Sequence, residues 1–388
     1  MAEANRIQVS FSRETVYGTP LTAAYNEIPI IGGAMVHSNA FNRSATIRAD
    51  AQRDASERTS EEPNASYDFE FEATTFDEFM RGALRSDADW TTDVAISGTD
   101  IAAVASGNKF TKASNWTGEN IVVGQWVYVG GFTGNTTNNG WVQVTALSTT
   151  DLTVAGKTLV DDTAGETVTV DGNHLLNGTA KHSYTIQQEY KDLTNHWHLL
   201  DGARISSLSQ TITPDAIIQG NVSFDGQTRT QTTSDNGTFT AAASKDVMPE
   251  GTAFGGHLID LAATTYDIMG LSWTINIPTR PRKPLGATVR SDIELGSPEV
   301  TGSMEVYLED GTWALDTNWT AFTKMSMAYS LVEGTDRYLF YFPQIVMTSE
   351  PAVIGGVDTD IMLSFDWEAE AAELYSGGAV HTMQVSRV

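Results

Sequence analysis

The sequence predicts a mainly β protein with an internal repeat and one inserted β module. Three observations support this prediction. Thr, Val, Tyr, Phe and Trp are frequent between turns rich in Gly, Asn and Asp, while helical patterns are scarce. Blocks of similar sequence return in the same order in the second part of the chain. A group of short strand patterns interrupts the first of the two copies.

The stretch from residue 44 to residue 84 organises the rest of the chain. Residues 47–64 form a polar arm dense in charges of both signs. After this arm, apolar residues alternate with acidic ones over six positions, with Tyr67, Phe69 and Phe71 set against Asp68, Glu70 and Glu72. This period of two predicts a strand with one buried face.

A short helix is expected directly after this strand. We place its start at Thr74 or Thr75, because these threonines precede Asp77 and Glu78 as an N-cap precedes the acids of a first turn. Apolar side chains then recur at helical spacing, at Phe76, Phe79, Met80 and Leu84.

The same order of blocks returns after residue 262. Residues 44–50 read SATIRAD, and residues 286–292 read GATVRSD. Further along, residues 203–227 resemble residues 341–370, because each contains an alternating strand, a proline turn and a strand ending in Ser-Phe-Asp. Any two β domains share some turn and strand signals of this kind, so a coincidental similarity is the alternative to a duplication. The ordered series favours an internal duplication.

The middle of the chain contains an insertion. Residues 109–171 contain four or five short strand patterns, whose spacing indicates a small barrel, sandwich or immunoglobulin-like module. Residues 85–107 are small and polar and are expected to be a linker, and residues 229–262 a long connection. The resulting prediction is a discontinuous first domain (1–94 with 176–262), an inserted domain (95–175) and a second domain (263–388).

Composition limits the function. The chain of 388 residues has no cysteine, which excludes disulfides, thiolate nucleophiles and zinc ribbons. Its 23 Lys and Arg against 49 Asp and Glu give a net charge of −26, which argues against tight nucleic-acid binding. The polar N-terminus and the lack of an apolar run of about 20 residues predict no signal peptide and no membrane insertion, hence a protein made and used in a cytoplasm.

No motif supports catalysis. Residues 156–158 read Gly-Lys-Thr, but the earlier glycine of a phosphate loop is missing. His196 and His198 share one strand face without an obvious third metal ligand. The aspartates at positions 358, 360 and 366 fit no calcium loop. We therefore expect no enzyme activity, no cofactor and no metal.

Two arms remain as candidate contact segments. The first carries eight charged residues, and the second carries Arg290, Asp292 and Glu294 at matching places. The contact candidates are Arg48, Asp50, Arg53, Asp54, Glu57, Arg58, Glu61 and Glu62 in the first arm, and Arg290 and Asp292 in the second. A solvated loop is one interpretation. Because a charged arm occurs twice beside the same kind of strand, we favour an arm that reaches a neighbouring subunit through complementary charge.

Taken together, these blocks resemble the tail tube proteins (major tail proteins) of bacteriophages with long, non-contractile tails. The resemblance rests on RETVYGTPLTAAYNEIPI (13–30), SATIRAD, YDFEFEATTFDEFMRGAL (67–84), GQWVYVGGFTGNTTNNGWVQVTALSTTDLTV (124–154) and ITPDAIIQGNVSFDGQT (212–228). It covers nearly the whole chain. The order of the blocks is more specific than any single motif.

This resemblance implies a β-sandwich or barrel core with one flanking helix in each tube domain. It implies subunits that form rings, and rings that stack into a hollow tube through which the genome is ejected. Most members carry one tube domain and form hexameric rings. Two copies per chain therefore predict a homotrimeric, pseudo-hexameric ring, with the inserted module outside and the arms contacting the adjacent ring.

The implied partners are further copies of the chain, tail tip or initiator and terminator proteins, and a tape measure protein inside the tube. DNA would pass without specific binding, because a net-acidic lumen repels phosphates. The lumen-facing candidates are Asp68, Glu70, Glu72, Glu305 and Glu309. The implied location is the virion tail, assembled in the bacterial cytoplasm.

There are two alternatives to the tube protein. One is a carbohydrate-binding phage or surface protein that uses Trp126, Trp141 and Trp197. The other is an enzyme such as a polysaccharide hydrolase, which requires a cleft with two carboxylates and has no support in the sequence. Self-association distinguishes the tube protein from both alternatives.

Overall fold

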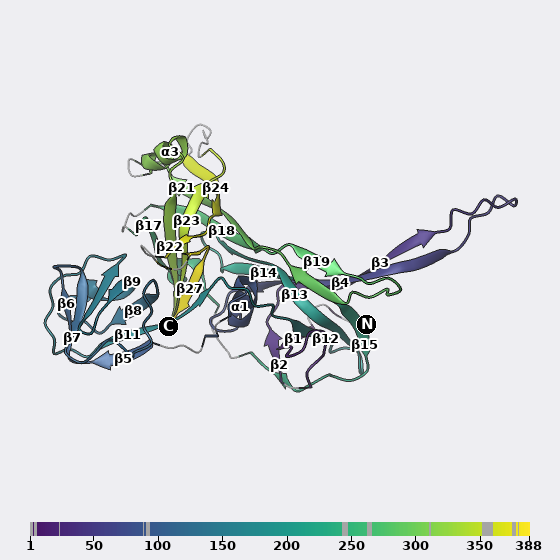
Figure 1. Cartoon of the computed structure of the whole chain (residues 1–388), viewed down its shortest axis with the longest axis horizontal. Helices are drawn as coiled ribbons and strands as arrows, with labels where there is room; N and C mark the ends of the chain where they lie inside the picture. The colour runs from purple at the N-terminus through teal and green to yellow at the C-terminus, as the bar shows by residue number, and fades with distance from the viewer. Residues whose placement is uncertain are drawn as a thin grey trace.

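The computed structural model of the chain describes residues 3, 6–22, 24–87, 89–90, 94–242, 247–261, 266–309, 312–350, 360–374, 378 and 380–388. Strands dominate and helices are short (Figure 1), which confirms the predicted mainly β class. Among these residues, no helix is long and apolar enough to span a membrane.

One twisted antiparallel sheet runs through both halves of the chain. Its strands lie in the order β3 (Gly32–Arg43), β4 (Ser56–Glu70), β14 (Gln219–Asp225), β13 (Trp197–Ile212), β18 (Ile268–Asn276), β21 (Glu299–Tyr307), β24 (Met362–Ala369) and β23 (Asp336–Met347). The pairing of β13 with β18 joins the first half to the second. Since every neighbouring pair is antiparallel, β4 and β21 run in the same direction.

A second layer covers the inner face of this sheet, so that each half is a β-sandwich. In the first half this layer contains β1 (Ile7–Arg13), β2 (Tyr25–Ile28), β12 (Tyr184–Tyr190), β15 (Thr228–Thr232) and β16 (Phe239–Thr240). In the second half it contains β17 (Phe254–Ile259), β22 (Met325–Glu333) and β27 (Gln384–Arg387). The segment 229–262, expected to be a connection, thus contributes strands to both halves.

Aromatic side chains fill the space between the layers. The predicted alternation holds in β4, where Tyr67 and Phe69 are buried and Asp68 is exposed. The ring of Phe69 stacks on Phe76 at 3.8 Å between centroids. Phe71 contacts the ring of Tyr338 from the second half at 5.6 Å, so both halves share one core.

Helix α1 (Asp77–Leu84) follows β4 as predicted, but it begins later than expected. Thr75 does not cap it, because its hydroxyl group donates to Glu72 and to the carbonyl of Ala73. Thr74 takes a left-handed conformation with φ of 65°, which turns the chain before the helix. The predicted N-cap at Thr74 or Thr75 is therefore wrong.

The strand before this helix is also longer than predicted. β4 begins at Ser56, inside the segment interpreted as an irregular arm, because this polar part pairs with β3 as far as Arg43. The first arm is thus a two-stranded hairpin that projects from the body of the molecule (Figure 1).

The inserted module has its own sheet and its own core. It contains β5 (Val94–Gly98), β6 (Ile101–Val104), β7 (Lys109–Lys112), β8 (Trp126–Gly130), β9 (Gly140–Leu147), β10 (Asp151–Ala155) and β11 (Val168–Leu176). Because β5 and β6 fall within residues 85–107, the prediction of a linker there is wrong for these strands. β11 pairs with β5 and β8 in the module and then with β27, which fixes the module to the second half.

The remaining elements include two further α-helices and two short hairpins. Helix α2 (Glu250–Ala253) is a single turn before β17. Helix α3 (Trp313–Thr320) follows β21, as α1 follows β4. The short hairpin β19 (Thr279–Arg282) and β20 (Asp292–Leu295) links β18 to β21, at the place where the first arm links β3 to β4. A last small hairpin pairs β25 (Ala372–Glu373) with β26 (Val380–His381).

Candidate assembly surfaces

The outer face of the long sheet is polar and acidic. Side chains that alternate with the buried ones point away from the core, and they are mostly small and hydroxylated. They include Ser66, Asp68, Asn221, Ser223, Ser272, Thr274, Thr301, Ser303, Glu305, Ser364, Asp366 and Glu368. Hydroxyl groups of adjacent strands bond across this face, as between Ser272 and Ser303 at 2.8 Å. Residues 64–70, β14, β18, β21 and β24 contain no lysine or arginine.

The five lumen-facing candidates fall into three groups. Asp68 and Glu305 are exposed on this outer face, and the amide of Asn221 donates to Asp68 at 2.6 Å. Glu70 is half-buried at the end of β4. Glu72 and Glu309 lie beyond the strand ends, and burial raises the pKa of Glu72 above its usual value. The backbone N–H of Glu309 donates to the Thr312 hydroxyl at the start of α3, at 2.7 Å.

The first arm contacts little else in the chain. Near its tip, the Arg48 guanidinium bonds Asp50 at 2.8 Å and Asp54 at 2.9 Å. Arg53 and Glu57 are exposed. Nearer the sheet, Arg58 bonds Glu61 at 2.7 Å on the same strand. These ion pairs lie within the arm and do not tie its tip to the body, while backbone pairing of β3 with β4 holds the hairpin together.

The second arm, by contrast, lies against the first half of the same chain. The carbonyl of Thr288 accepts a bond from the backbone N–H of Glu61 at 3.1 Å. The Lys283 ammonium donates to the carbonyl of Thr59 at 2.5 Å. Arg290 lies 4.0 Å from Glu62 and also donates to the carbonyl of Gly226. The second arm thus rests on the base of the first.

Arg204 on β13 anchors the second arm. Its side chain is 5% exposed, pairs with Asp292 at 3.1 Å and donates to the carbonyl of Ile293. The guanidinium also lies over the ring of Tyr17, 4.3 Å from its centroid. We did not predict this residue, although an arginine inside the buried run of residues 199–205 signals a specific partner.

Two buried carboxylates lie beside this anchor. Glu14 accepts bonds from the Gly18 and Gly202 backbone N–H groups, both at 2.8 Å. Asp201 is 7% exposed, and burial together with the Glu14 charge raises its pKa to about 7. These groups were also absent from the sequence-based candidates.

The free edge of β3 is a further candidate assembly surface. β3 pairs with β4 on one side, and no described strand pairs with its other side. An unpaired edge presents backbone N–H and C=O groups that can extend a sheet into a second molecule.

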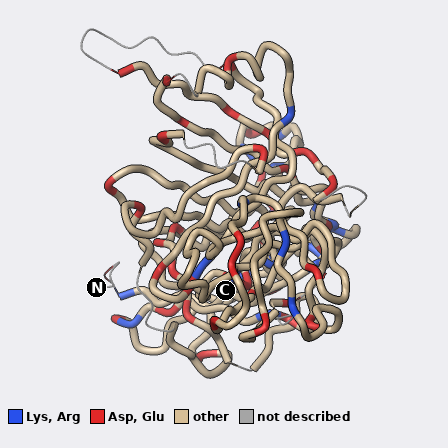
Figure 2. The backbone as a smooth tube through the Cα atoms, turned by 90° about the vertical axis from the view of Figure 1, so that its left-hand side faces the viewer, with Lys and Arg blue, Asp and Glu red and all other residues tan. Residues whose placement is uncertain are grey.

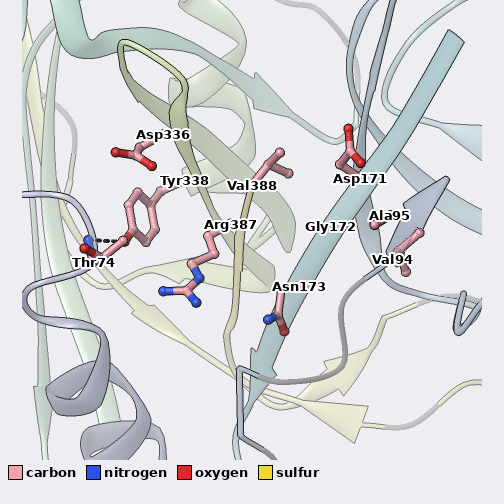
Figure 3. Close-up of a pocket in the computed structure, with 10 residues that line it drawn as sticks. All are labelled: Thr74, Val94, Ala95, Asp171, Gly172, Asn173, Asp336, Tyr338, Arg387 and Val388. Atoms are coloured by element: carbon pink, nitrogen blue, oxygen red, sulfur yellow. Dashed lines mark hydrogen bonds between the residues drawn. The ribbon is translucent and has the colours of Figure 1, made fainter. Parts of the chain in front are cut away.

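A hollow of about 350 Å³ lies where the module, the first half and the second half meet (Figure 3). The Tyr338 hydroxyl accepts from the Thr74 N–H and donates to Asp77, each at 2.7 Å. Arg387 forms an ion pair with the same Asp77. These groups are thus committed to holding the three parts together.

The residues considered for catalysis in the sequence form hydrogen bonds with other groups of the protein. The Lys157 ammonium donates to the carbonyls of Thr137 and Asn139. The ring of His198 accepts from Arg229, at 2.7 Å. Position 358 lies outside the described residues, and among those described no three His, Cys, Asp or Glu side chains form a metal-binding group.

The sequence was compared with models of known protein families. A family model described as phage tail tube protein matches residues 4–369, nearly the whole chain. The chain belongs to the phage tail tube protein family. Among curated proteins, no match was found.

Membership of this tail tube family confirms the predicted structural function. The protein is a subunit of a phage tail tube, in which stacked rings form the hollow conduit for the genome. It is a virion tail component that assembles with further copies of itself and other tail proteins. The family is structural rather than enzymatic, and no finding favours the carbohydrate-binding alternative.

Proposed function

We propose that three copies of this tail tube protein form each ring, with six pseudo-equivalent tube domains. The observation that carries this proposal is the seam between β13 and β18, which already joins two sandwich halves edge to edge within one chain. The halves share their order of parts, since β4 leads to α1 and β21 leads to α3. A duplication with domains at 1–94 plus 176–262 and at 263–388, and an insertion at 95–175, accounts for both features.

In this ring the free edge of β3 pairs with β24 of the next chain. Only residues 367–369 of β24 pair with β23, so the edge of residues 362–366 has no partner among the described strands. Each chain then supplies one internal seam and one seam between chains, and three chains close the circle. A closed ring leaves no strand edge exposed. The inserted module is fixed to the second half by β11 and lies on the outer surface of the ring.

The outer face of the long sheet lines the lumen in this arrangement. Asp68, Glu70 and Glu305 lie on or at the end of this face, while Glu72 and Glu309 lie at its rim. Because residues 64–70, β14, β18, β21 and β24 carry no lysine or arginine, we expect this acidic surface to repel DNA phosphates. The acidic residues far outnumber the basic ones over the whole backbone as well (Figure 2).

The first arm is the contact between rings. Its candidate residues extend from Arg48 to Glu62, and the tip is free of the body. Arg290 and Asp292 serve a different purpose, because Arg290 pairs with Glu62 at the base of the first arm and Asp292 pairs with the buried Arg204 of β13. The arm therefore connects copies of the chain along the tube.

Other tail components complete the assembly. We include tail tip or initiator and terminator proteins at the two ends and a tape measure protein inside, with assembly in the host cytoplasm. The chain itself needs no cofactor and performs no catalysis in this role.

Electron microscopy of the purified chain at rising concentration, with sedimentation alongside, tests the proposed function. We expect rings or tubes whose rings contain three chains and six inner lobes. Tubes with six whole chains per ring would contradict the trimer and retain the tube. A monomer at every concentration that binds glycans would contradict the function itself.

The lumen assignment has its own test. Ser223→Lys and Ser303→Lys each place an ammonium group on the outer sheet face, one in each half. Both variants are expected to form tubes that retain DNA more strongly at low salt than unmodified tubes, because cations bind phosphates. A lysine at Val122 of the module is the control, and equal retention by all three variants would contradict the assignment.

A further inference from the structure

The strand directions define two different ends of the long sheet. The tip of the first arm lies at the N-terminal end of β4, and α1 follows the C-terminal end of the same strand. β21 runs in the same direction as β4 and is followed by α3. Arms therefore leave one end of the sheet and α3 stands at the other, where α1 begins before it turns back over the inner face of the sheet (Figure 1).

Head-to-tail stacking brings these two ends together. In a polar stack every ring has the same orientation, so the contact is heterologous and joins unlike surfaces. The arm end of one ring then faces the helix end of the next. The surface that receives the arm must consequently lie near α1 or α3.

The two helices differ in what they leave exposed. In α1, all residues except Glu78 are buried, and Trp90 and Tyr184 cover it from the same chain. In α3, Leu315 alone is buried. Trp313 is 61% exposed, and Phe322 just after the helix is 64% exposed. Of the two described helices at this end, α3 thus presents the apolar surface.

The arm tip and the α3 surface are complementary. Ile47 at the tip is 98% exposed and can cover an aromatic side chain. The outer part of the hairpin, residues 43–58, carries four arginines and three carboxylates and is net positive in a chain of charge −26, although the whole arm (47–64) carries three arginines and five carboxylates. Residues 308–323 carry three carboxylates and no lysine or arginine. Charge complementarity of this kind selects the partner and its orientation.

We infer that the first arm of each chain docks on the α3 surface, formed by Trp313, Phe322 and the acids around them, of a chain in the adjacent ring. This inference rests on the proposed tube function. Each chain has one projecting arm, because the second arm is held by its own first half, and one exposed helix surface. A ring of three chains therefore offers three arms to three receiving surfaces.

Cysteine cross-linking tests this contact, since the natural chain has no cysteine. One population carries Ile47→Cys and another carries Trp313→Cys, and the two are mixed before tube assembly and treated with a short bis-maleimide. We expect a cross-linked species of two chains, each of 42.0 kDa. As a matched control, Ile47→Cys is mixed with Val122→Cys, whose valine is also half-exposed but lies on the module.

The outcomes separate the inference from the proposed function. Cross-linking of the Trp313→Cys pair at least tenfold above the Val122→Cys control, in tubes but not in isolated rings, supports the inference. Tubes that form normally but show no excess over the control overturn it and leave the tube function intact. If the unmodified chain forms no ring or tube at all, the tube function fails and the inference fails with it.

The double variant Trp313→Ser with Phe322→Ser gives an independent result. We expect rings of normal size and at least a tenfold loss of tubes, because the residues are exposed and their removal leaves the fold intact. Tubes of normal number and length from this variant would contradict the inference.

Discussion

The two halves of this tail tube protein use the same parts differently. The first half has a free arm and a buried helix, and the second half has a docked arm and an exposed helix. Both arms begin with similar sequences, at residues 44–50 and 286–292. Similar local sequence therefore does not decide whether an arm is free or docked.

The difference arises from what lies next to each element. The second arm lies beside β13 and β4 of the same chain, where Arg204 holds it. The corresponding neighbour of the first arm does not exist within the chain, because β3 is the edge of the sheet. Under the proposed duplication, one of the two arms has its partners within the chain and the other is left for assembly.

The largest expected difference between the halves concerns their helices. Phe79→Ala in α1 removes a ring that contacts Phe11 at 4.6 Å in the shared core. The free energy of unfolding should fall by about 3–5 kcal/mol. Trp313→Ala in α3 should change it by less than about 0.5 kcal/mol. Urea unfolding followed by circular dichroism measures both, and equal losses would contradict the contrast between the helices.

The second expected difference between the halves concerns their arms. Arg204→Ala leaves the carbonyl of Ile293 without its donor and is expected to cost about 1–3 kcal/mol in unfolding free energy. It should also release the second arm, so that trypsin cleaves faster after Arg282 and Arg290. Arg53→Ala in the free arm is the matched control, with no change in stability. Unchanged cleavage in the Arg204 variant would show that other contacts hold the second arm.

A third expected difference is a pH dependence that arises from Asp201 in the first half. The pKa of Asp201 is about 7 in the folded protein against 3.8 ordinarily, so the folded state binds its proton more tightly. Its protonated form therefore supports folding below about pH 4, and this support is lost as the pH rises to about 7. Asp201→Asn should flatten the fall in melting temperature between pH 5 and pH 8.

Exposed Asp366→Asn in the second half is the control for this pH effect, and it should leave the fall in melting temperature unchanged. The raised pKa of Asp201 would be contradicted if Asp201→Asn melts with the same pH dependence as the unmodified chain. One pKa unit corresponds to about 1.4 kcal/mol, so the expected change is readily measured.

Local patterns in the sequence predicted what depends on local physics. Alternation of Tyr67 and Phe69 with Asp68 identified the buried face of β4, and the spacing of Phe76 and Phe79 identified α1. The helix start was missed because the hydroxyl of Thr75 bonds back to Glu72. The polar half of β4 was missed because backbone pairing with β3, rather than apolar side chains, makes it a strand.

Local patterns could not predict contacts between segments that are far apart in the sequence. Arg204 and Asp292 are far apart in sequence, and only the seam between β13 and β18 brings them together. The exposure of Trp313 likewise depends on which segments fail to cover α3. The charged residues of the first arm were recognised in the sequence, and their contact with a neighbouring chain stays a prediction.

The number of chains per ring tests the central claim most directly. Mass measurement of isolated rings, together with the symmetry of averaged end-on images, gives this number without any variant. The account predicts three chains of 42.0 kDa and six inner lobes, of which alternate lobes carry the inserted module. A ring of six chains with six identical outer modules would contradict it.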